Sequence, residues 1–97
     1  MSDPKPGDLD TVFHSPKRLI ALSILDVAKE VEFKYLKERL GISDSDLSKQ
    51  LSKLIDLNII DMRKTGYGRK SSTWYAMTPE GKVLFKNYKE TLKAILP

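Results

Sequence analysis

The chain has 97 residues, a net charge of +4 and a pI near 9.3. This length fits one domain with a small core, and the basic balance favours an acidic partner. The absence of cysteine excludes disulfides and thiolate zinc sites, and it is compatible with a reducing cytoplasm. The longest apolar run, Leu19 to Leu25, is far too short to span a bilayer, so we expect no membrane association.

The reactive side chains argue against an enzyme. The only histidine is His14, and the sequence has no glycine-rich phosphate-binding motif and no carboxylate pair spaced for acid–base chemistry. One histidine and scattered acids do not make a metal site either. We therefore expect no catalytic residue, no metal and no cofactor.

The first predicted helix begins at Ser15 and Pro16, an N-cap and first-turn pair, and ends near Lys29. Apolar residues lie almost all the way round this helix, so both of its sides must be covered. One side can pack on the core of the domain. The other side needs the leading segment, 9–13, or a second subunit.

A helix pair with a tight turn is predicted next. The first of these helices ends at Leu40, Gly41 makes the turn, and the second helix covers 43–56 with leucines at i, i+4 and i+7 on its buried side. A short helix pair joined by a glycine-containing turn is the helix-turn-helix signature. The opposite face and its flanks are polar and rich in hydrogen-bond donors, as a groove-entering helix requires: Ser45, Asp46, Ser48, Lys49, Gln50, Ser52 and Lys53.

A basic hairpin follows the helix pair. Two period-2 segments flank a turn with glycines at 66 and 68, and no acid occurs between Met62 and Pro79. The predicted wing, over 63–72, would attract phosphate through its positive charge. Basic hairpin residues also prevent edge-to-edge aggregation, so they have a second explanation. The candidate contacts of the wing are Arg63, Lys64, Tyr67, Arg69 and Lys70.

The last predicted helix, over 79–96, begins after Thr78 as its cap. Residues 1–8 hold two prolines and a glycine among charges, which predicts a flexible tail before a single domain over 9–97. The spare apolar surface of the first and last helices predicts dimerisation through both. The candidate interface residues are Leu22, Leu25, Leu84, Tyr88, Leu92 and Ile95.

The segments Leu40-Gly41-Ile42-Ser43, Leu47-Ser48 and Thr73-Trp74-Tyr75 carry a family likeness. With them the chain resembles the small winged helix-turn-helix transcription regulators of bacteria and archaea, in the MarR/ArsR group. The resemblance implies a mainly α fold with a small β-hairpin wing. It also implies a homodimer that binds a palindromic operator in double-stranded DNA. From the donor face of helix 43–56, the basic wing and the spare apolar helix surface we expect a repressor, located in a prokaryotic cytoplasm and associated with the nucleoid when bound to DNA. Helix 43–56 would lie in the major groove and the wing against the flanking backbone or minor groove.

The sequence departs from that family's pattern in the recognition helix. Where such proteins often have Gly-Asn before the Leu-Ser pair, this chain has Ser45 and Asp46, and Gln50 replaces a common histidine. Glutamine can read adenine through N6 and N7. Asp46 could accept a hydrogen bond from cytosine N4 or hold a neighbouring lysine in place.

Three questions stay open at this level. Arg18 could contact a phosphate or pair with an acid, either Asp26 or Glu30. A winged helix also serves as a protein-interaction module or as a sequence-independent DNA-coating protein, because fold does not fix function. No small-molecule effector is identified by the sequence.

Overall fold

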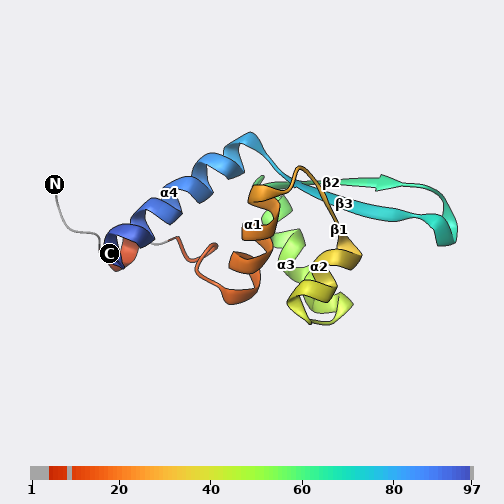
Figure 1. The fold of residues 1–97 in the computed structure, drawn as a ribbon, viewed down its shortest axis with the longest axis horizontal. Helices are drawn as coiled ribbons and strands as arrows, with labels where there is room; N and C mark the ends of the chain where they lie inside the picture. Colours follow the sequence, from red (N-terminus) through yellow and green to blue (C-terminus); the bar gives the residue numbers. More distant parts are fainter. Residues whose placement is uncertain (1–4, 9, 97) are drawn as a thin grey trace.

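The computed structural model describes residues 5–8 and 10–96, in which four α-helices and a three-stranded sheet form a winged helix arrangement (Figure 1). A 3-10 turn at Pro6–Asp8 precedes them, and a second one, at Gly68–Lys70, lies at the hairpin tip. The elements in chain order are α1 (Pro16–Val27), β1 (Val31–Glu32), α2 (Phe33–Leu40), α3 (Asp44–Asp56), β2 (Ile60–Thr65), β3 (Ser72–Met77) and α4 (Pro79–Ile95).

The sheet is antiparallel with strand order β1-β3-β2. The two long strands pair from Ile60 opposite Met77 to Thr65 opposite Ser72, and β1 adds only two residues to the other edge of β3. The hairpin therefore extends well beyond the short β1. This confirms the predicted fold of helices with a small β-hairpin wing.

The molecule is elongated, with extents of 54 × 25 × 21 Å. The first three helices cluster at its centre, the hairpin projects to one side, and α4 projects to the other (Figure 1). Each helix contributes apolar side chains to one core, which is where most of the fold's stabilisation by burial arises. The largest fully buried side chains are Phe13, Leu22, Leu25, Leu36, Leu47, Leu51, Leu54, Ile60 and Phe85.

A buried threonine joins α4 to the body. The Thr78 hydroxyl donates to the Asn58 carbonyl over 2.7 Å, and it accepts a hydrogen bond from the Gly81 amide over 2.8 Å as the predicted helix cap. The Thr78 amide donates to the Ile59 carbonyl. A side chain at position 81 would overlap that Ile59 carbonyl, so glycine is required for the close approach. The start of α4 is thus fixed against the turn between α3 and β2.

The structure corrects several boundary and burial predictions. Helix α1 ends at Val27 rather than near Lys29, and α4 ends at Ile95. Residues 1–4 of the predicted tail lie outside the described residues. The leading segment does reach the core, because the Phe13 ring is buried, with its centroid 5.4 Å from that of Tyr88.

The predicted dimer residues fall into two groups. Leu22, Leu25 and Tyr88 are buried in the core of the single chain, so they leave no surface for a second copy. Their apolar character is explained by intramolecular packing. Leu84 and Ile95 are exposed on α4 instead, and Leu92 is partly buried against the core: the last helix keeps an uncovered apolar side.

Candidate nucleic-acid interface

The turn between α2 and α3 has the local structure that the sequence predicts. Gly41 adopts a left-handed conformation, with φ of 64°, and its amide donates to the Lys37 carbonyl over 2.8 Å. Two residues later the Ser43 hydroxyl accepts a hydrogen bond from the Asp46 amide and caps α3. The Lys37 ammonium also pairs with the Asp44 carboxylate over 2.8 Å, which ties the two helices together at the turn.

Helix α3 has one buried and one exposed side. Its buried side consists of Leu47, Leu51 and Leu54, which are at most 1% exposed. Asp46 and Gln50 lie half-buried on the flank. The remaining predicted contact residues are exposed on the opposite face and project short hydroxyls or flexible ammonium groups: Ser45, Ser48, Lys49, Ser52 and Lys53.

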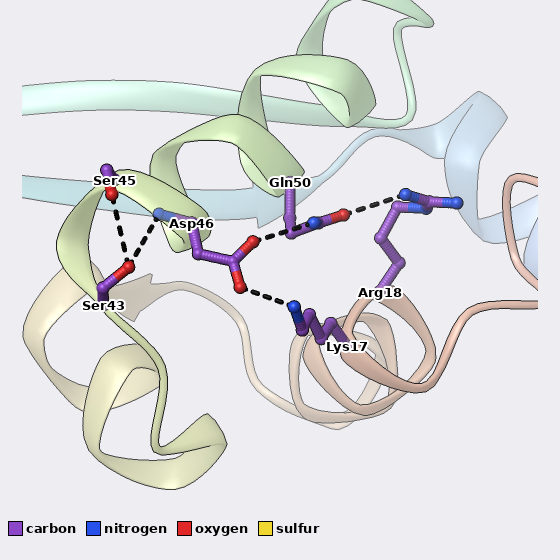
Figure 2. A network of polar contacts seen from close by, with 6 residues as sticks. All are labelled: Lys17, Arg18, Ser43, Ser45, Asp46 and Gln50. Atoms are coloured by element: carbon purple, nitrogen blue, oxygen red, sulfur yellow. Dashed lines mark hydrogen bonds and ion pairs between the residues drawn. The ribbon is translucent and has the colours of Figure 1, made fainter.

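A chain of polar contacts links the first turn of α1 to α3 (Figure 2). Asp46 accepts from the Lys17 ammonium over 2.6 Å and from the Gln50 amide nitrogen over 3.0 Å. The Gln50 amide oxygen in turn accepts from Arg18 over 2.8 Å. Arg18 is itself held by the Val12 carbonyl, to which it donates over 2.7 Å. The two helices are therefore joined through Asp46 and Gln50, which the sequence assigns to DNA contact, and through Lys17 and Arg18 of α1.

These contacts change the acidity of Asp46. The hydrogen bond from Lys17, followed by the one from Gln50, lowers the pKa of the Asp46 carboxyl, although desolvation acts in the opposite direction. The carboxylate is thus charged at neutral pH. Of the two roles that the sequence left open for Asp46, the structure shows the one in which it holds a neighbouring lysine.

The tip of the hairpin is exposed and basic. Gly66 has φ of 78°, and a side chain there would overlap the Lys70 carbonyl, so this glycine permits the tight turn. Tyr67 is 94% exposed beside it. Lys64, Arg69 and Lys70 are exposed, and none of them forms an ion pair within residues 5–8 and 10–96.

Arg63 differs from the other basic residues of the wing. It lies at the base of the hairpin, where its guanidinium pairs with the Glu30 carboxylate and lies over the Trp74 ring at 6.0 Å. The hydrogen bond from Arg63 lowers the pKa of Glu30. The charge of Arg63 is therefore already paired within the chain, unlike the charges of the basic residues at the wing tip.

Within residues 5–8 and 10–96, Arg18 does not pair with an acid. Its suggested partners have others: Asp26 accepts from Lys89 of α4 over 2.7 Å, and Glu30 accepts from Arg63. The Arg18 guanidinium contacts Gln50 and backbone carbonyls instead, and it is only partly exposed.

Lys17, which contacts Asp46 of α3, was not identified from the sequence. A cation in the first turn of a helix is unfavourable beside the positive end of the helix dipole. The adjacent Lys17 and Arg18 at the start of α1 therefore signal a partner elsewhere. Sequence alone could not show that the partners are Asp46 and Gln50.

Two hollows flank these elements. A cleft of about 630 Å³ lies between α3 and the sheet, and its walls include Ser48 and Ser52 on one side and Lys64 on the other. A more apolar groove, of about 670 Å³, lies on the outer side of α1 and α2, next to Ile20 and Trp74. Helix α3 and the strands of the wing therefore form the two walls of the first hollow, which is a concave surface.

Within the described ranges, no helix is long and apolar enough to cross a membrane. The same residues contain no group of three acidic, histidine or cysteine side chains placed to hold a metal ion.

The sequence model of a family described as "Winged helix DNA-binding domain" matches residues 17–96. The chain belongs to this family. Winged helix domains of this family are DNA-binding modules rather than enzymes, in agreement with the sequence prediction. An uncharacterized protein of Methanocaldococcus jannaschii is 34% identical to this winged helix domain over 77 residues, which is 79% of this chain and 84% of that protein.

Solved structures share the winged helix fold. A transcriptional regulator homologue from Pyrococcus horikoshii OT3 superposes with a TM-score of 0.82 at 18% identity, over 90% of this chain and 86% of that one. A MarR-family protein from Porphyromonas gingivalis W83 gives 0.68 at 21% identity, over 86% and 80% of the two chains. The likeness to transcription regulators of the MarR/ArsR group, expected from the sequence, is thus present at the level of fold.

Proposed function

We propose that the protein is a sequence-specific double-stranded DNA-binding transcription regulator that acts as a homodimer on a palindromic site. The observation that supports this most directly is the concave surface between α3, with Ser48 and Ser52, and the strand residue Lys64, together with the exposed basic side chains at the wing tip. In this proposal α3 enters the major groove, and Arg69 and Lys70 contact the flanking backbone or minor groove.

The polar residues of α3 suit this role because major-groove edges present both acceptors and donors. Ser45, Ser48 and Ser52 offer hydroxyls, while Lys49 and Lys53 offer charged donors to bases or phosphates. An α3 used mainly to bind another protein would present apolar side chains, and Leu57 just beyond its end is the only large one exposed there in the described chain.

A homodimer is proposed because α4, which projects from the body in Figure 1, carries exposed apolar side chains. Val83 and Leu84 are 59% and 44% exposed, and Ile95 and Leu96 are exposed near its end. Pairing of two copies through α4 would cover them. Two α3 helices could then enter successive major grooves about 10 base pairs apart.

We propose that the regulator represses transcription in the cytoplasm, because a dimer bound at a promoter would block access to that promoter. Binding to a pool of random duplexes, followed by selection of the preferred sequence at two salt concentrations, tests the proposal. A palindromic winner bound by a dimer supports it. Salt-steep binding with no preferred sequence would indicate an architectural protein, and no binding at low salt would point to a protein partner.

A further inference from the structure

The polar chain in Figure 2 fixes the direction in which the Gln50 amide points. A glutamine amide has two N–H donors on one end and an oxygen acceptor on the other, and a free amide can turn over easily. Here the nitrogen faces Asp46 at 3.0 Å, and the oxygen faces Arg18 at 2.8 Å. Both partners contribute to this direction.

Chemistry enforces the direction. An ionised carboxylate can only accept hydrogen bonds, and a guanidinium can only donate them. Turning the Gln50 amide over would place its oxygen against the Asp46 carboxylate and its nitrogen against Arg18. Both contacts would then become repulsive. The charge of Asp46 is stabilised by Lys17 at 2.6 Å, and Arg18 is held by the Val12 carbonyl, so both ends of the chain are themselves anchored.

The amide keeps some bonding capacity after these contacts. One of its two N–H groups is used by Asp46, and one of the two lone pairs of its oxygen is used by Arg18. One donor and one acceptor remain. This is the pair that adenine requires in the major groove, where N7 accepts and the N6 amino group donates.

We propose that Asp46 and Arg18 are positioning residues that fix the polarity of the Gln50 amide, so that α3 selects adenine at one position of each half-site. This rests on the proposed entry of α3 into the major groove. Guanine presents two acceptors and thymine a single one beside a methyl group. An amide free to turn could offer both of its N–H groups to guanine, whereas a fixed one, with one donor and one acceptor left, makes two hydrogen bonds with adenine alone. Asp46 and Arg18 sharpen specificity without touching a base.

The test is selection from a random double-stranded DNA pool by the wild-type protein and matched variants. The double variant Arg18→Gln/Asp46→Asn replaces both partners by amides that can donate or accept, so either direction of Gln50 becomes acceptable. Lys86→Gln is the control, because it removes one exposed positive charge on α4 and leaves Lys17, Asp46, Arg18 and Gln50 unchanged. The variant Gln50→Ala identifies the base pair that Gln50 reads.

The expected wild-type preference for adenine at that base pair is about tenfold over guanine, as a bidentate contact gives. The double variant should reduce it to roughly twofold, the single variant Asp46→Asn should give an intermediate value, and Lys86→Gln should retain it. Melting curves confirm that each variant is folded. Full adenine preference in the folded double variant, or unchanged preferences in Gln50→Ala, would overturn the inference while leaving DNA binding intact. A wild-type protein that prefers no sequence would overturn the proposed function as well.

Discussion

The Arg63 guanidinium of β2 pairs with the Glu30 carboxylate just before β1 and lies across the Trp74 ring of β3. One basic side chain thus ties together all three strands at the base of the wing. At the tip, Arg69 and Lys70 are exposed without an ion pair in the described chain. The positive charge of the wing therefore has two parts, one that holds the sheet and one that remains open to an anionic partner.

Replacing Arg69 and Lys70 by alanine should weaken binding to all DNA sequences alike. Log affinity falls with log salt concentration, and the magnitude of this slope decreases by about one for each lost phosphate contact. The slope of the double variant should therefore be shallower than that of the wild type by about two. Fluorescence anisotropy with a labelled duplex over a salt series measures this slope. Arg63→Ala is the matched control, and it should lower the melting temperature while keeping the slope. Equal slopes in the wild type and the tip variant would exclude the tip from DNA binding.

The fold should lose stability at acid pH through two carboxyls. Hydrogen bonds from Lys17 to Asp46 and from Arg63 to Glu30 lower the pKa of each acid in the folded chain. Their contribution is therefore complete above the pKa of the unfolded chain, and it disappears as the pH falls through the lowered folded pKa. Melting temperature should fall more steeply below about pH 4 in the wild type than in Asp46→Asn/Glu30→Gln. Parallel curves for the two proteins would show that neither pair contributes.

Surface and core leucines should respond differently to substitution. Leu84→Lys with Ile95→Lys places charge on the exposed side of α4, so the proposed dimer should dissociate while each chain stays folded. Leu22→Ala should instead cost about 2–5 kcal/mol of unfolding free energy, because it opens a cavity in a fully buried site. Sedimentation equilibrium and urea denaturation measure the two effects. A double lysine variant that dimerises with unchanged affinity would exclude this side of α4 as the interface.

The joint at the start of α4 should be sensitive to small changes. Thr78→Ala removes the helix cap and the bond to the Asn58 carbonyl, and it should cost about 1 kcal/mol or more. Gly81→Ala should cost about 1–3 kcal/mol, because the new methyl group overlaps the Ile59 carbonyl. The control is Thr91→Ala, because the Thr91 hydroxyl donates to the Asn87 carbonyl one turn earlier in the same helix and does not join α4 to the body. Urea denaturation gives the free energies, and a Gly81→Ala protein as stable as the wild type would contradict the packing argument.

Features that depend on neighbouring residues were predictable from the sequence. The turn at Gly41, the cap at Ser43, the leucine stripe of α3 and the cap at Thr78 each arise from a short local pattern. Local hydrogen bonding and helical periodicity decide these features before the chain folds. The glycine-bounded tip of the wing belongs to the same class.

Long-range features were not predictable in this way. The apolar residues on every side of α1 indicate two covers, but they do not tell that Leu22 and Leu25 face the chain's own core while Ile20 stays exposed. Similarly, Lys17 and Asp46 are 29 residues apart, and their pairing depends on how α1 crosses α3. Such contacts are set by packing between elements, which a one-dimensional pattern does not contain.

The hydrogen bonds of Thr78 at the start of α4 affect which spacing between two DNA half-sites the proposed homodimer can bind. Because the start of α4 is bonded to the turn that ends α3, the position of α4 is tied to that of α3. In the proposed homodimer, the distance between the two α3 helices is then already set in the free protein, before DNA binds. One extra base pair between the half-sites would rotate the second half-site away from the α3 helix that binds it, and neither α3 helix could adjust its position to match. The central bases would matter through their number and their stiffness.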